Sequence, residues 1–347
     1  MTRASAEWLF QFVCGPKAIP FDGSLTYHVN QLLAWVTNFI DILRIALKST
    51  SSTLIVLAHT PQFGLGAALA KVLIPSRLRF VVRVIGNDPS VSLLVRRSWW
   101  RFKLERGIER FVLSTADVVL PMGNYTDDLA RSYGVDPQKI LVLPFPVTWP
   151  QRPEITDLPT KPTVLFCGRL IKEKGVHILL QAMKLVQQRV SDACLVIVDD
   201  TDNEAYRLEL KEIVESLGMK GSVSFLGHIT NDAIAVKYTE SWVLVLPSIW
   251  EEGLGMVMVE AGLMGSAVIG SNLGGISDFI IDGKNGHLVP PGDVDKLAAA
   301  IGDILENRTR AIEMGNQNNI LARKYLENFD RAVLRVQQAI YELAEIK

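Results

Sequence analysis

The chain has 347 residues, of which 36 are lysine or arginine and 37 are aspartate or glutamate. One hydrophobic core rarely serves so long a chain, so the length predicts two domains. The near balance of charge gives no electrostatic reason to expect nucleic acid as a partner. Cys14, Cys167 and Cys194 lack metal-ligand spacing and favour a reduced, cytoplasmic protein over a disulfide framework.

The first residues do not predict a signal peptide, because the apolar run is short and Pro16 and Pro20 soon follow it. Residues 32–47 are apolar but carry Asp41 and Arg44. This stretch is too short and too charged for a membrane span, and it favours an amphipathic helix.

In the first part of the chain, short apolar runs alternate with longer helix-like segments. The runs lie at 8–13, 54–58, 79–85, 118–120 and 140–143. Such alternation predicts a doubly wound α/β domain with a parallel sheet, over residues 1–148.

Prolines then gather at positions 144, 146, 150, 153, 159 and 162, a density that predicts an interdomain linker over residues 149–162. The alternation restarts after the linker and predicts a second domain of the same class over residues 163–325. Residues 326–347 are expected to form a C-terminal helix that packs back on the N-terminal domain. Its predicted apolar stripe is Val333, Leu334, Val336, Ile340 and Leu343.

Glu252 and Glu260 bracket a glycine turn between a predicted buried strand and a predicted helix that starts at Met256. The free N–H groups of a helix N-terminus favour a phosphate, and Gly253 and Gly255 let the backbone approach a ligand closely. The two carboxylates suit sugar and ribose hydroxyls. From the spacing alone, an ordinary helix start with Glu252 as a dipole partner and Glu260 exposed is an equally good interpretation.

Three further loops follow predicted strands of the second domain. In the loop 168–175, Arg169 can donate two hydrogen bonds to two diphosphate oxygens, and Lys174 adds a mobile positive charge. The alternative interpretation is a solvated loop without a ligand. The backbone near Gly227 suits a nucleobase edge, whereas His228 alone is more typical of a surface. Residues 270–275 form a small-residue loop that admits a ligand or makes a plain turn.

These motifs, in this order and spacing over most of residues 163–300, resemble the carboxyl half of glycosyltransferase family 4. The matching segments are 168–170, 174–175, 247–255, 260–261, 270–275, 278–280, 282–283 and 285–286. The resemblance implies the GT-B architecture, in which two Rossmann-like domains with parallel sheets face across a cleft. It places the donor in the second domain and the acceptor in the first.

The resemblance also implies roles for matching residues. Arg169, Lys174 and Glu252 would be catalytic: the two cations hold the donor diphosphate and stabilise the leaving group, and Glu252 binds hydroxyls of the transferred sugar. Glu260 would bind the nucleotide ribose. The remaining implied donor-binding residues are Gly23, Gly168, Gly227, His228, Gly253, Leu254 and Gly255.

The implied activity is retaining transfer of a hexosyl group from a UDP-sugar or GDP-mannose type of donor to a glycan or lipid-linked acceptor, within cell-surface polysaccharide synthesis. The expected mechanism is front-face displacement without a metal or other cofactor, because cations and a helix dipole offset the developing charge. The alternatives are a donor-binding module that has lost turnover and a GT-B sugar-nucleotide epimerase. The Glu252 and Glu260 pattern speaks against the epimerase.

The first half departs from the family pattern. Gly23 matches a family glycine, but Ser24 replaces a second one, and Ile85 stands where the family has a histidine near the reacting centre. Asp88 is a candidate for that polar role, while His59 is better explained by a loop contact.

A basic and aromatic segment at 96–103 is expected to form a helix. Arg96, Arg97 and Arg101 are candidate acceptor contacts or contacts to the cytoplasmic face of a membrane, whereas Trp99 and Trp100 favour a core position.

Overall fold

The structure is a computed structural model that describes residues 25–48, 53–61, 64–86, 99–147, 157–199 and 203–345. The predictions for Gly23, Asp88, Arg96, Arg97 and the strand at 8–13 concern residues outside these ranges. The side chains of Trp99, Trp100 and Arg101 are also outside the description.

The chain divides into two compact units. Unit 1 comprises Met1–Leu143 with Arg331–Lys347, and unit 2 comprises Pro144–Asp330. The described end of the predicted linker, residues 157–162, therefore belongs to unit 2.

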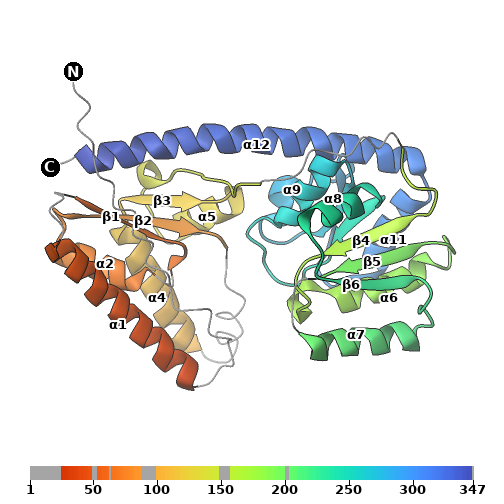
Figure 1. Cartoon of the computed structure of the whole chain (residues 1–347), viewed down its shortest axis with the longest axis horizontal. Helices are drawn as coiled ribbons and strands as arrows, with labels where there is room; N and C mark the ends of the chain where they lie inside the picture. Colours follow the sequence, from red (N-terminus) through yellow and green to blue (C-terminus); the bar gives the residue numbers. More distant parts are fainter. Residues whose placement is uncertain are drawn as a thin grey trace. The chain divides into compact units, whose positions relative to one another are not determined.

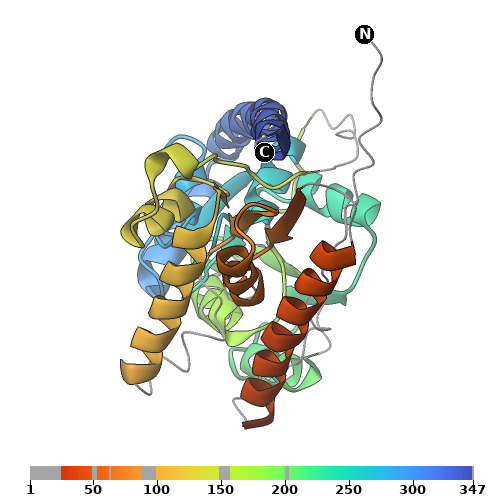
Figure 2. The ribbon, with the colours of Figure 1, turned by 90° about the vertical axis from the view of Figure 1, so that its left-hand side faces the viewer.

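Unit 1 contains a three-stranded parallel sheet in the order β1-β2-β3. Its strands are β1 (Leu54–Ala58), β2 (Leu78–Val84) and β3 (Val118–Pro121). The helices before residue 144 are α1 (Leu25–Lys48), α2 (Leu65–Leu73), α4 (Trp99–Thr115), α5 (Asn124–Ser132) and the 3-10 turn η2 (Pro137–Lys139). Figure 2 shows α2 between α1 and α4, in agreement with its contacts to both.

The core of unit 1 has two sides because the strands are buried on both faces. Phe80, Val82 and Val119 belong to the core shared with α1, α2 and α4. Val81 and Leu120 point to the other face, where they pack against the C-terminal helix.

Residues 140–143 do not form the predicted strand. A single parallel bridge joins Ile140 to Val119, and the N–H groups of Leu141 and Leu143 donate to carbonyls of β3. Pro144 and Pro146 follow immediately, and a proline has no N–H with which to continue a ladder.

Unit 2 contains a six-stranded parallel sheet in the order β6-β5-β4-β7-β8-β9. The strands are β4 (Thr163–Cys167), β5 (Cys194–Val198), β6 (Val223–Gly227), β7 (Val243–Leu246), β8 (Ala267–Ser271) and β9 (Gly286–Val289). The helices are the 3-10 turn η3 (Lys172–Lys174), α6 (Val176–Val186), α7 (Glu204–Ser216), α8 (Asn231–Thr239), α9 (Met256–Met264), α10 (Ile276–Phe279) and α11 (Val294–Leu305). Figure 1 shows α6 and α7 on one face of this sheet and α8 and α9 on the other.

The strand order of unit 2 reverses between β4 and β7. The chain first builds β4, β5 and β6 in one direction and then returns to place β7 on the other side of β4. At such a switch point the loops that follow the two strands diverge, and ligands of open α/β sheets bind there. This topology therefore predicts a ligand site at the carboxyl ends of β4 and β7.

The last helix, α12 (Arg308–Glu345), starts well before the predicted residue 326 and contributes to both units. Within unit 2, the buried Asn318 donates to the Ser266 carbonyl and accepts from Asn285. Within unit 1, Val336 is buried against β2 and β3.

The predicted stripe of this helix needs one correction. Leu334 is 67% exposed, whereas Val336 is 6% exposed and Ile340 and Leu343 pack partly against the core. Two residues along a helix turn by about 200°, so Leu334 and Val336 cannot share a face. No helix within the described ranges is long and apolar enough to cross a membrane.

Candidate active site

Three loops meet at the carboxyl edge of the unit 2 sheet. They follow β4, β7 and β8 and comprise residues 168–175, 247–255 and 272–275. Because β7 pairs with both β4 and β8, the three loops leave neighbouring positions of one sheet edge.

The loops after β4 and β7 are packed backbone to backbone. The N–H of Ile249 donates to the Glu173 carbonyl at 2.9 Å. Gly175 has φ of +71°, and a Cβ added there would lie 2.0 Å from the Pro247 carbonyl oxygen. Only glycine combines this left-handed conformation with so close an approach.

The loop after β8 supports the glycine turn from the other side. The N–H of Gly275 donates to the Glu252 carbonyl at 2.7 Å. A Cβ on Gly274 would lie 2.5 Å from that same oxygen, and one on Gly275 would lie 1.9 Å from the Gly253 oxygen. The small residues predicted to admit a ligand therefore accommodate the backbone of residues 252–253.

Lys174 and Glu252 form an ion pair between these loops. The Nζ of Lys174 lies 2.5 Å from Oε1 of Glu252, and the two side chains are 16% and 17% exposed. The fully buried Ser248 donates its hydroxyl to the same oxygen at 2.7 Å. Glu252 precedes α9, whose first turn holds no acidic residue. Its carboxylate binds Lys174 and Ser248, so it is more than a partner of the helix dipole.

Arg169 lies on the same loop as Lys174 but is exposed, and its side chain makes no hydrogen bond or ion pair within the described residues. Gly168, which precedes it, has φ of +151° and donates its N–H to the Val198 carbonyl. Of the three cations in the loop, Lys174 is paired with Glu252, Lys172 is paired with Glu209 and Arg169 is solvated.

The helix α9 begins at Met256 with Gly255 at its N-cap, and no side chain caps it. The N–H groups of a first helical turn have no partner inside the helix, and they favour an anion together with the helix dipole. Gly255 has φ of +76°, and a Cβ there would lie 2.6 Å from Cδ2 of Leu246. Gly253 and the buried Leu254 complete this turn.

Glu260 projects from α9 into a largely buried position. It is therefore not the exposed residue that an ordinary helix start would have there. The hydroxyl of Tyr238, on α8, donates to Oε2 of Glu260 at 2.9 Å. Burial raises the pKa of Glu260, and the hydrogen bond from Tyr238 offsets part of this effect. Tyr238 is completely buried and also interacts with the side chain of Cys167 at the end of β4.

Gly227 and His228 are on the same sheet edge but lie apart from the three loops. Gly227 is the last residue of the edge strand β6 and His228 follows it, and β6 is separated from β4 by β5. Gly227 has φ of +65°, and His228 is exposed. Their contact with a nucleobase stays a prediction.

In unit 1, two predicted positions are described. Ile85 follows β2 and is partly exposed, and Gly86 after it has φ of +117°. His59 follows β1 and is exposed. Both lie at the carboxyl ends of parallel strands.

Sequence reasoning missed two side chains of the site, Ser248 and Tyr238. Ser248 stands directly after Pro247, the residue that follows β7, so its nearness to Glu252 in the sequence was a usable signal. Tyr238 is 22 positions before Glu260 on a different helix. No spacing rule links residues on two helices whose contact is set by tertiary packing.

Two family models match the chain in succession. The model described as "Glycosyl transferase 4-like domain" covers residues 2–146, and "Glycosyl transferases group 1" covers residues 148–320.

Among curated proteins, the chain is similar to two enzymes named GDP-mannose-dependent alpha-(1-6)-phosphatidylinositol monomannoside mannosyltransferase. The one from Mycobacterium tuberculosis is 28% identical over 275 residues, which span 74% of this chain and 69% of the relative. The one from Mycolicibacterium smegmatis is 30% identical over 243 residues, which span 68% of this chain and 58% of the relative.

Among solved structures, the sucrose-phosphate synthase from Thermosynechococcus elongatus is 22% identical, with a TM-score of 0.75 over 90% of this chain and 78% of that one. Anabaena HepE in complex with UDP is 18% identical, with a TM-score of 0.68 over 90% and 84% of the two chains. At these identities the likeness shows the fold. With its two parallel-sheet α/β units and both family models matched, the chain is a GT-B glycosyltransferase and belongs to glycosyltransferase family 4.

Proposed function

We propose that the protein is a retaining mannosyltransferase that uses GDP-mannose and transfers the sugar to a lipid-linked acceptor without a metal. The observation that carries the proposal is the pairing of Lys174 and Glu252 beside the uncapped N-terminus of α9. The choice of donor and acceptor class is supported by the names of the mycobacterial relatives.

Each group of the site has a task in this proposal. Arg169, Lys174 and the N-terminus of α9 bind the donor diphosphate and stabilise the charge that develops on it. Glu252 accepts hydrogen bonds from hydroxyls of the transferred sugar. Glu260 accepts hydrogen bonds from the ribose, so the two carboxylates bind rather than transfer protons.

In the reaction, the bond between the anomeric carbon and the diphosphate oxygen breaks. The acceptor oxygen forms its bond to that carbon on the same face, and its proton passes to the departing phosphate oxygen. GDP leaves, and the configuration at the anomeric carbon is retained. Fixed cations and a helix dipole supply the stabilisation that a metal would otherwise provide.

A second candidate is a donor-binding module without turnover. Ile85 favours it, because an aliphatic side chain at the end of β2 replaces the histidine of the family pattern. An epimerase of the same fold is the remaining alternative, and it would alter the donor without an acceptor.

The experiment begins with thermal unfolding in GDP-mannose, GDP, UDP-glucose and UDP, because a ligand of the folded state raises its stability by mass action. We expect the guanosine compounds to give the larger rise in Tm. GDP-mannose is then incubated with membrane lipid extracts that hold mannosylated acceptors, and the product linkage is read by NMR. An inverted linkage would reject retention, tight binding without any turnover would favour the module, and conversion of the donor alone would favour the epimerase.

A further inference from the structure

We propose that Tyr238 is a positioning residue for nucleotide recognition, whose hydroxyl holds one oxygen of Glu260 so that the other accepts from the ribose hydroxyls. This inference rests on the proposed function, in which Glu260 binds the ribose. It assigns a task to a side chain that never touches the donor.

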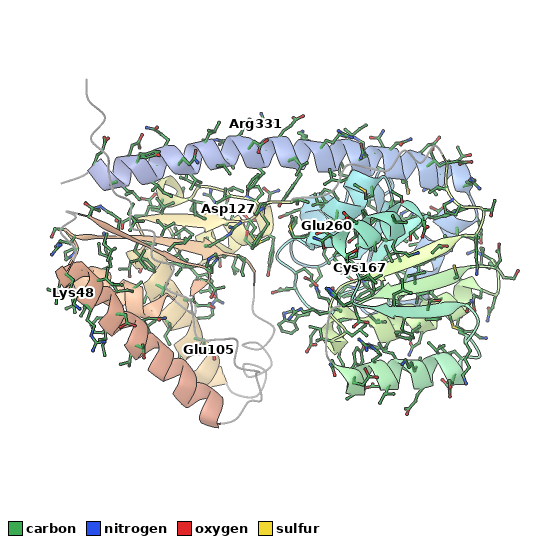
Figure 3. All side chains as sticks on the ribbon, viewed as in Figure 1. Lys48, Glu105, Asp127, Cys167, Glu260 and Arg331 are labelled. Atoms are coloured by element: carbon green, nitrogen blue, oxygen red, sulfur yellow. The ribbon has the colours of Figure 1, made fainter. Side chains whose placement is uncertain are left out.

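The geometry around Glu260 supports an oriented carboxylate. Tyr238 donates to Oε2 at 2.9 Å, and Oε1 has no hydrogen-bond partner within the described residues. A carboxylate that already has one neutral donor keeps lone pairs on both oxygens for further hydroxyl donors. Figure 3 labels Glu260 on α9 and Cys167 at the end of β4, the two residues whose side chains interact with Tyr238.

Tyr238 itself is fixed in place at both ends. Its ring is completely buried, and its backbone carbonyl accepts a hydrogen bond from the buried Ser266 hydroxyl. A phenol has few rotatable bonds, so a ring packed in this way presents its hydroxyl at one point. The carboxylate that receives the bond loses rotamer freedom before the nucleotide arrives, which lowers the entropic cost of binding.

A merely structural tyrosine would give a different signature. If Tyr238 only fills the core, its loss weakens every ligand of unit 2 by a similar factor. If it orients Glu260, its loss weakens only those ligands whose ribose hydroxyls meet the carboxylate. The informative quantity is therefore a ratio of affinities rather than a single affinity.

The test measures dissociation constants of GDP and of 2′,3′-dideoxy-GDP by calorimetry for the wild type, Tyr238→Phe and Glu260→Gln. We expect the wild type to prefer GDP about tenfold to a hundredfold, the range for hydrogen bonds to a charged group. Tyr238→Phe is expected to lower this ratio at least threefold with little change for the dideoxy compound. Glu260→Gln is expected to lower it further.

The control is Tyr206→Phe, which removes the hydroxyl of another buried tyrosine of unit 2. That hydroxyl lies 2.9 Å from Nδ1 of His177 and does not contact Glu260. The control is expected to keep the wild-type ratio. Circular dichroism of each variant establishes that it is folded before its ratio is used.

The pH dependence gives a second readout. Within the described residues, Tyr238 is the titratable group that contacts Glu260, and Cys167 in turn interacts with the side chain of Tyr238. Removing the donor makes the Glu260 carboxylate easier to protonate, so in Tyr238→Phe the preference for GDP should disappear at a higher pH than in the wild type.

The outcomes separate the two proposals. A Tyr238→Phe variant with the wild-type ratio and pH midpoint, while Glu260→Gln loses the preference, would overturn the inference and leave the ribose role of Glu260 intact. A wild type that binds GDP and 2′,3′-dideoxy-GDP equally well would overturn both the positioning task of Tyr238 and the ribose role of Glu260. Sugar transfer from GDP-mannose is measured separately, so its absence would count against the proposed activity alone.

Discussion

Lys174 and Glu252 approach to 2.5 Å from two loops that are 78 positions apart in the sequence. Neither residue is placed by its own loop alone, because Gly175 and Pro247 lock the two loops together at the switch point of the sheet. The site therefore holds its acidic and basic groups in mutual contact. In the proposed function, a donor exchanges this pairing for contacts of Lys174 to its diphosphate and of Glu252 to its sugar.

Lys174→Ala should lower kcat about a hundredfold to a thousandfold, the usual cost of removing one group that stabilises developing negative charge. The measurement is steady-state transfer from GDP-mannose. The control is Lys172→Ala on the same turn, whose side chain is 66% exposed and pairs with Glu209. A Lys174→Ala enzyme with wild-type rates would remove this lysine from the site.

Ser248→Ala should weaken the hold on Glu252, because Ser248 is fully buried and donates to the carboxylate at 2.7 Å. Losing a hydrogen bond to a charged group costs about 1.5 to 3 kcal/mol, which corresponds to a fall in kcat/KM of about tenfold to a hundredfold.

The matched control for this serine is Ser241→Ala. Ser241 is also buried, but its hydroxyl donates to the Lys237 carbonyl at 2.6 Å and does not contact the site. Equal losses of activity in the two alanine variants would show that the effect comes from packing and not from Glu252.

The runs 164–167, 195–198, 243–246 and 267–270 are short, apolar and largely buried, which is why the sequence predicts them as strands. The run 223–225 is also predicted, although β6 alternates partly buried with exposed residues, whereas β9, which begins at a glycine, is not predicted. Helix and strand signals closely flank the site residues. The sequence therefore predicts that Arg169 and Lys174 lie in the loop after β4, Glu252 in the turn before α9 and Glu260 on α9. It could not place Leu334 correctly, since the helix that carries it also contains apolar residues that face solvent. Contacts such as that between Tyr238 and Glu260 depend on how two helices cross, which local patterns do not encode.

Gly175→Ala should destabilise unit 2 strongly. A left-handed conformation costs an alanine about 1 kcal/mol, and here the added Cβ would also lie 2.0 Å from the Pro247 carbonyl oxygen. Gly218→Ala isolates the first effect, because Gly218 has φ of +69° with open space around it. Denaturant unfolding should show a clearly larger loss for Gly175→Ala, and equal losses would contradict the locked junction of the two loops.

Glu260→Gln should raise the stability of the ligand-free protein at neutral pH while weakening nucleotide binding. Burial raises the pKa of Glu260 in the folded state, so the folded chain binds this proton more tightly than the unfolded chain does. The free energy of unfolding therefore falls as pH rises from the unfolded pKa through the folded one. Glutamine removes this loss because it carries no charge, and its side-chain oxygen can still accept from Tyr238.

The measurement is Tm as a function of pH without ligand, followed by GDP affinity at neutral pH. The gain in Tm should be largest above the raised pKa of Glu260 and should vanish in acid, where the wild-type carboxyl is protonated as well. Glu209→Gln is the control, since that carboxylate is 47% exposed and remote from Tyr238. A Glu260→Gln protein that is less stable than the wild type at neutral pH would mean that the carboxylate stabilises the fold. A gain in stability with a loss of affinity would instead mark Glu260 as a charge that is kept buried for the sake of its ligand.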